Sequence, residues 1–286
     1  MSDKKFRLGW ITDPHLDFVH IEGLRSLYGK INSQDLDALV ITGDIAEGNT
    51  IDAYMRFLTQ SVKVPVFFVL GNHDYYMTTI SGVRVNMVAN WSNFKKVGEQ
   101  LVKHSGTWLP GVTPDNGPLS FVQLTPGVAL CGHDGWYDGL YADWFKSKVI
   151  MPDYSHITDF KLLQRQDLFD MLQVLAQESA DYAEKVLPLA FDAGNSHVFF
   201  ATHVPVFPEN SFFNGMISDN DWMPHFSNKH LGDALLKIMA SYPEKKLTIL
   251  QGHSHGKTQF HPKQNIASHT GFAKSRSPAL NNVFEF

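Results

Sequence analysis

The sequence is organised by short apolar runs, each of which stops abruptly at polar side chains able to bind a metal ion. The clearest run, at positions 66–70, is typical of a buried strand and is followed at once by Gly71-Asn72-His73-Asp74. Four further runs end in the same way. The polar residues that follow them are Asp13 with His15, Asp44, His203, and His253 with His255.

Segments with helical spacing separate the first three apolar runs, which begin at Phe6, Ala38 and Val66. Repeated strand-and-helix units predict a parallel sheet wound with crossover helices, and the pattern by itself favours one open sheet. Later segments predict strands at 120–124, 128–131, 197–201, 247–250, 258–261 and 265–269, and helices at 81–104, 157–187 and 231–240. Pro188 is expected to end the second of these helices.

The polar residues at these strand ends should converge, because ligands of open α/β sheets bind outside the carboxyl ends of the strands. Setting His73 aside, the converging groups are two carboxylates, one amide and four imidazoles. Nitrogen and oxygen donors without a thiolate suit zinc, iron, manganese or cobalt. These groups are too many for one ion and fit two divalent transition-metal ions if one carboxylate bridges them.

Two such ions carry more charge than the two carboxylates neutralise, so the cluster would attract phosphate. A pair of metals can lower the pKa of a shared water and hold both oxygens of an in-line displacement. His73 is not needed as a ligand and is free to protonate the leaving alkoxide. The sequence therefore predicts hydrolysis of a phosphomonoester or phosphodiester by attack of a metal-bridging hydroxide.

Composition narrows the partners of this site. The formal charge is −5, and no run of Lys or Arg is longer than a pair, which argues against nucleic acid and anionic membranes as partners. The single cysteine, Cys131, suits a reducing compartment, and no segment resembles a signal peptide or a membrane span. We therefore expect a cytoplasmic protein with a small phosphorylated substrate, while its oligomeric state stays open.

The five blocks, in their order along the chain, resemble those of the calcineurin-like metallophosphoesterases. They are Asp13-Pro14-His15, Gly43-Asp44, Gly71-Asn72-His73-Asp74, His203 and Gly252-His253-Ser254-His255. The resemblance covers nearly the whole chain and implies a four-layer αββα sandwich, two mixed sheets face to face with helices outside. It implies a single domain over residues 1–286, with insertions near 132–157 and 204–228.

The resemblance also implies a role for each block. One metal would be held by Asp13, His15, Asp44 and His255, the other by Asp44, Asn72, His203 and His253, with Asp44 as the bridge and His73 as the proton donor. In the phosphoprotein phosphatases of this superfamily the second block continues as Gly-Asp-x-x-Asp-Arg-Gly. In this sequence Glu47 stands in place of the second Asp of that motif, and Gly48 stands in place of its Arg. Glu47 can still orient His73, but the phosphate-gripping arginine is absent.

Several alternatives remain at the level of sequence. His133 and Asp134 follow another strand and are candidates for substrate contact, although a loop-capping role fits them equally well. A nuclease or a protein phosphatase of the same superfamily is the alternative enzyme. A metal-stabilised interaction module without turnover is the alternative from another class, because a fold and even a site do not guarantee activity.

Overall fold

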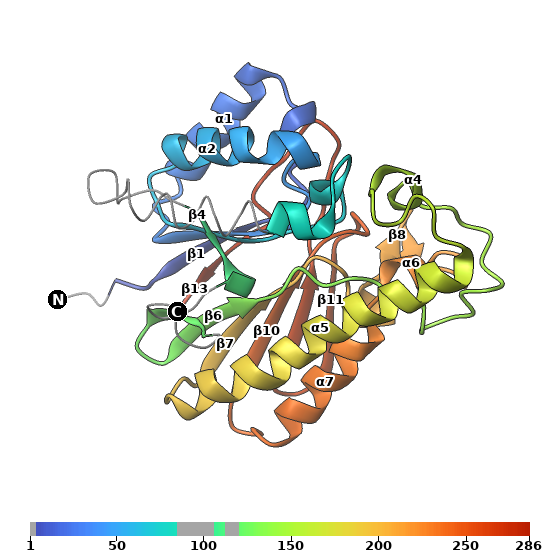
Figure 1. Ribbon diagram of the computed structural model, residues 1–286. Helices are drawn as coiled ribbons and strands as arrows, with labels where there is room; N and C mark the ends of the chain where they lie inside the picture. Colours follow the sequence, from blue (N-terminus) through green and yellow to red (C-terminus); the bar gives the residue numbers. More distant parts are fainter. Residues whose placement is uncertain (1–3, 85–105, 112–119) are drawn as a thin grey trace.

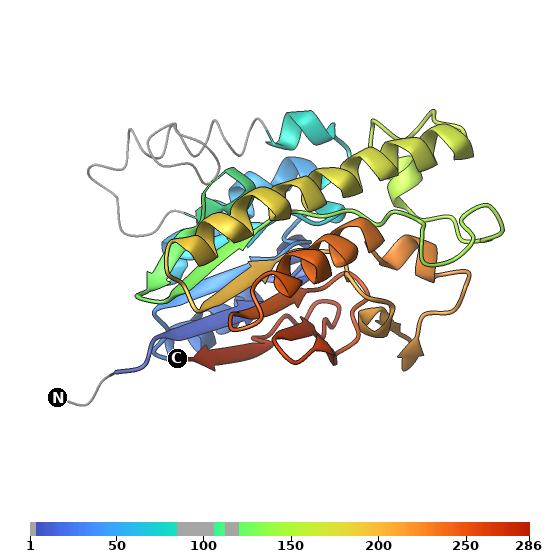
Figure 2. The ribbon, with the colours of Figure 1, turned by 90° about the horizontal axis from the view of Figure 1, so that it is seen from below.

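The computed structural model describes residues 4–84, 106–111 and 120–286, and the predicted helix at 81–104 falls almost entirely outside these ranges. Two β-sheets lie face to face, and helices cover the outer face of each (Figure 1). The helices of the first outer layer are α1 (Ile21–Asn32) and α2 (Ile51–Ser61). Those of the second are α5 (Arg165–Asp192) and α7 (Lys229–Ala240), which run side by side in Figure 2.

The first sheet is built by the N-terminal strand-and-helix units and closed by the C-terminus. Its strands, in spatial order, are β13 (Asn282–Glu285), β1 (Arg7–Ile11), β2 (Ala38–Thr42), β3 (Val66–Val69) and β4 (Gly106–Trp108). Strands β1 to β4 are parallel, whereas β13 pairs antiparallel with β1. The parallel arrangement places the ends of β1, β2 and β3 at one edge.

The second sheet is formed by strands that lie between residues 122 and 270. Its strands, in spatial order, are β11 (Thr258–Lys263), β12 (Ile266–Thr270), β10 (Lys246–Gln251), β7 (His197–Ala201), β6 (Val128–Gly132) and β5 (Val122–Thr125). Strands β6, β7, β10 and β12 are parallel, while β5 and β11 pair antiparallel at the two edges. The predicted hairpin of β5 and β6 is confirmed.

Side-chain alternation along the strands explains the four layers. In β2, Leu39 and Ile41 face the helices α1 and α2, while Val40 belongs to the core between the two sheets. In β7, Phe200 packs toward α5 and α7, and Phe199 packs into the inter-sheet core. Strands that are apolar on both faces need a cover on each side, so each sheet is sandwiched between helices and the other sheet.

Three expectations from the sequence are corrected by the structure. The strands form two sheets rather than one open sheet, because the chain starts a second parallel set after β4. Helix α5 begins at Arg165 rather than 157 and continues through Pro188 to Asp192. The last turn survives the proline because Ala190 and Phe191 are buried against the second sheet. Strand β13 at the sheet edge was not predicted.

The two predicted insertions meet beyond one end of the sandwich. Helix α4 (Asp153–His156) comes from the first. The second provides the hairpin β8 (Phe212–Phe213) and β9 (Met216–Ile217), together with α6 (Met223–Phe226). Figure 1 shows these elements on the right of the molecule, and a hydrogen bond between Tyr154 and His225 joins α4 to α6. Within the described ranges, none of the helices combines the length and apolarity that crossing a bilayer requires.

The inter-sheet core predicts a large cost for Leu250→Ala. Leu250 on β10 is fully buried between the sheets, so removing its side chain should lower the free energy of unfolding by about 2–5 kcal/mol. Leu162→Ala is a matched control, because Leu162 is 92% exposed. Urea unfolding of both variants measures the difference, and a loss below about 1 kcal/mol for Leu250→Ala would contradict this account of the core.

Candidate metal centre

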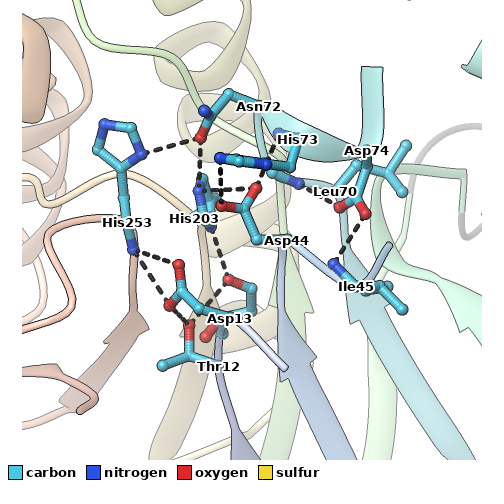
Figure 3. Close-up of polar contacts among 12 residues, drawn as sticks. Thr12, Asp13, Asp44, Ile45, Leu70, Asn72, His73, Asp74, His203 and His253 are labelled. Carbon is cyan, nitrogen blue, oxygen red and sulfur yellow. Dashed lines mark hydrogen bonds and ion pairs between the residues drawn. The ribbon is translucent and has the colours of Figure 1, made fainter. Parts of the chain in front are cut away.

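The residues predicted to bind metals come together where strands of both sheets end, and Figure 3 shows Asp13, Asp44, Asn72, His203 and His253. From the first sheet, Asp13 and His15 follow β1, Asp44 follows β2 and Asn72 follows β3. From the second sheet, His203 follows β7, and His253 and His255 follow β10. Asp44 Oδ1 lies 3.4 Å from His203 Nε2, a contact that joins the two sheets at their edge. The centre therefore exists only because the sheets are stacked with their strand ends aligned.

The backbone at these strand ends is unusual. Asp13, His15, Asp44, His253 and His255 all have a positive φ, between 40° and 66°. Left-handed conformations of this kind cost about 1–3 kcal/mol each and persist where the surroundings impose them. Asp and His are among the side chains that tolerate them best. These left-handed residues follow β1, β2 and β10, where the chain leaves each strand and presents its polar side chains to the centre.

The first donor set consists of Asp13, His15, Asp44 and His255, the four residues that the resemblance assigns to one metal. One donor atom from each lies within 4.8 Å of all the others. Burial lowers the pKa of His15, so its imidazole stays neutral and keeps a lone pair for a metal. Burial opposes protonation of His255 too, but the hydrogen bond and charge of Asp13 win and raise its pKa.

In the second donor set, which consists of Asp44, Asn72, His203 and His253, backbone carbonyls face one nitrogen of each imidazole. His203 Nδ1 lies 2.9 Å from the carbonyl oxygen of Thr42, and His253 Nε2 lies 2.9 Å from that of His225. A carbonyl can only accept, so the ring nitrogen that faces it is the one that carries an N–H in each imidazole. The other nitrogens therefore present lone pairs. Burial lowers the pKa of His253 to about 4, which keeps that ring neutral.

These lone pairs face an oxygen rather than a donor. Asn72 Oδ1 lies 3.0 Å from His203 Nε2 and 2.9 Å from His253 Nδ1, and the carboxylate of Asp44 is close to the same point. Acceptor groups packed together without a proton between them repel one another. A cation resolves the repulsion, so this donor set fits a metal ion with nitrogen and oxygen ligands.

His73 lies beside both donor sets, on the 3-10 turn η3 (His73–Tyr75). Its Nε2 atom is 4.0 Å from Asp44 Oδ2, and its backbone N–H donates to Asp44 Oδ1 at 2.9 Å. The side chain is 27% exposed, so it can reach a substrate from the solvent side. Its Nδ1 atom has no hydrogen-bond partner among the described residues. Glu47 therefore makes no hydrogen bond to His73 Nδ1 in the described part of the chain, and its orienting role stays a prediction.

The structure buries both His133 and Asp134, which directly follow β6. Asp134 is fully buried, and its carboxylate accepts hydrogen bonds from Leu70 N at 2.8 Å, Tyr75 Oη at 2.7 Å and Trp108 Nε1 at 2.9 Å. The His133 ring packs near Tyr182 of α5, with centroids 5.4 Å apart. These contacts favour the loop-capping role for Asp134, and substrate contact by either residue stays a prediction.

Two further aspartates support the site, and of these only Asp74 belongs to a block identified in the sequence. Asp74 accepts backbone N–H bonds from Ile45, Ala46 and Gly71, which ties the Asp44 loop to the Asn72 loop. Asp153 accepts a bond from Asn72 Nδ2 across 81 residues of sequence. Asp153 lies in an insertion without a motif, so only the folded chain reveals its contact with a predicted metal ligand.

The fold and the site define a class. Residues 6–257 match the calcineurin-like phosphoesterase family, so the chain belongs to that family, a class of metal-dependent phosphoesterases. A probable cyclic nucleotide phosphodiesterase from Fibrobacter succinogenes is 32% identical over 84 residues. That match covers 26% of this chain and only a third (33%) of the length of the relative.

Solved structures resemble the chain over nearly its full length. A dimetal phosphatase from Danio rerio has a TM-score of 0.58 at 14% identity, covering 98% of this chain and 92% of its own. The phosphopantetheinyl hydrolase of Mycobacterium tuberculosis has a TM-score of 0.64 at 13% identity, covering 96% and 95%. At such low identity these structures show a shared fold. The predicted family and the predicted stack of two mixed sheets with helices are confirmed.

The close packing of the strand ends predicts that Gly71→Ala disrupts the centre. A Cβ atom at Gly71 would lie 2.7 Å from His203 Cε1 and would overlap Asp44, so both side chains must move. We expect the variant to bind metal more weakly than wild type in a calorimetric titration. Gly29→Ala is the control, because a Cβ there meets nothing within 4 Å, and equal metal affinities of the two variants would contradict the prediction.

Proposed function

We propose that this protein is a dinuclear-metal hydrolase that cleaves a phosphomonoester or phosphodiester of a small soluble molecule. One observation carries the proposal: two donor sets share Asp44 at the junction of the sheets, with His73 Nε2 4.0 Å from that carboxylate. Asp13, His15, Asp44 and His255 would hold one ion, and Asp44, Asn72, His203 and His253 the other. Manganese, iron, zinc and cobalt all suit these donors.

The chemistry divides between the ions and the side chains. When bound, two such ions lower the pKa of a shared water and neutralise charge on phosphoryl oxygens. The chain supplies the rest. His73 is partly exposed beside Asp44 and would protonate the leaving alkoxide. Buried Asp44 would keep the two halves of the centre in register, because it contacts His15 from the first sheet and His203 from the second.

The identity of the leaving group is the least constrained part of the proposal. The name of the Fibrobacter relative favours a phosphodiester, but the match covers only 26% of this chain. Gly48, which stands where the protein phosphatases have an arginine, argues against protein phosphatase activity. A side chain there would overlap the backbone carbonyl of Tyr76, so an arginine cannot occupy this place without moving the loop. The small phosphorylated substrate and the cytoplasmic location predicted from the sequence belong to the same proposal.

Activity on artificial esters tests the reaction. Protein loaded with manganese, iron, zinc or cobalt should hydrolyse p-nitrophenyl phosphate, bis-p-nitrophenyl phosphate or both. The release of nitrophenolate measures the rate. Asp44→Asn is the matched control, because it removes the bridging charge at nearly constant volume and should abolish turnover. If the metal-loaded wild type cleaves neither ester, the proposed reaction is wrong and an interaction module becomes the better interpretation.

His73→Ala tests the proton donor separately. The variant should keep both metals and lose about 10²- to 10⁴-fold in kcat, the usual contribution of a general acid. Elemental analysis and steady-state kinetics on an alkyl phosphate ester, whose alkoxide leaving group needs a proton, measure the two quantities on the same preparation. Loss of metal from the variant would instead make His73 a ligand, and an unchanged kcat would remove it from the mechanism.

A further inference from the structure

The carboxamide of Asn72 has two chemically different ends, and its orientation decides whether the second donor set can bind a metal. With Oδ1 toward His203 and His253, it offers a ligand atom. With the amide reversed, Nδ2 would face His203 Nε2 and His253 Nδ1, 3.0 and 2.9 Å from the present oxygen position. Both nitrogens carry lone pairs, so the reversed amide would donate to them and occupy the positions that a metal needs.

Asp153 of α4 lies on the other side of this carboxamide. Its Oδ1 atom accepts from Asn72 Nδ2 at 2.9 Å and from Tyr76 Oη at 2.6 Å, and its Oδ2 atom accepts from Tyr137 Oη at 2.8 Å. A tyrosine hydroxyl carries its proton at neutral pH, so both hydroxyls donate to this carboxylate. Asp153 itself is fully buried.

A carboxylate has no proton to donate, and this one already accepts hydrogen bonds from two tyrosine hydroxyls. It therefore favours the NH2 end of Asn72 and repels the oxygen end. Reversing the amide would place Asn72 Oδ1 against Asp153 Oδ1 in a buried site, where an unpaired acceptor is costly. The contact thus biases Asn72 toward the orientation that leaves its oxygen for a metal.

We propose that Asp153 is a positioning residue for the second metal, which it serves by fixing the orientation of the Asn72 carboxamide. The inference rests on the proposed metal centre and extends it into the 132–157 insertion. It corresponds to the way a carboxylate orients a metal-binding histidine in other proteins, with an amide in place of the imidazole. The neighbouring insertion has a parallel contact, because the carbonyl of His225 holds His253.

Asp153→Ala tests the proposal through metal binding. Without the carboxylate, Asn72 is free to turn its NH2 group toward the two histidines. We expect the variant to retain one metal per chain after dialysis instead of two, or to bind the second about 10–100-fold more weakly. Elemental analysis and a manganese titration by calorimetry measure these quantities without any substrate.

Two further variants separate orientation from general packing. Tyr137→Phe removes a hydrogen bond from the same carboxylate but leaves the Asn72 contact intact, so it should keep both metals. Asp153→Asn keeps a carbonyl oxygen that can accept from Asn72 and should restore the second metal. Circular dichroism establishes that each variant is folded.

The proposal is overturned if Asp153→Ala binds two metals with wild-type affinity, if Tyr137→Phe loses the second metal equally, or if Asp153→Asn fails to restore it. These results are distinct from a failure of the proposed reaction. A wild type that binds two metals yet cleaves no ester would refute the hydrolase and leave the role of Asp153 measurable.

Discussion

Face-to-face packing of the two sheets is the constraint on which the rest of the molecule depends. Trp10 and Val40 on one side, and Phe199 and Leu250 on the other, form a single apolar layer that fixes the sheets relative to each other. Because the strand ends are thereby aligned, Asp44 of the first sheet lies 3.4 Å from His203 of the second. A small slide between the sheets would separate the two halves of the centre.

The polar edge is stabilised differently from the apolar layer. The left-handed residues after β1, β2 and β10 carry conformational strain, which the hydrogen bonds of Asp74 and Asp13 offset. Asp13 accepts from the backbone N–H of His253 at 3.0 Å, so a predicted ligand from the first sheet also positions a loop of the second. Asp13 therefore both holds a loop of the second sheet and belongs to the predicted ligand set.

Much of this arrangement could be predicted from the sequence, and the remainder could not for identifiable reasons. Apolar runs followed by His, Asp or Asn located the strands and their polar ends, and the ordered blocks identified the family. Periodicity alone could not distinguish one open sheet from two stacked ones, because both need strands that are apolar on each face. Nor could it find the end of α5, where packing of Phe191 overrides Pro188.

Long-range polar contacts were equally invisible in the sequence. Nothing near Asp153 marks it as a partner of Asn72, and the carbonyl of His225 has no side-chain signature at all. Both belong to the insertions that meet at the end of the sandwich. Loop sequences usually vary among relatives because loops do not pack in the core. In this chain, one side chain and one backbone carbonyl of these loops contact residues of the predicted metal centre. If the proposed metal centre is correct, a change in the sequence of either loop would also change metal affinity, so these two loops cannot vary independently of the centre.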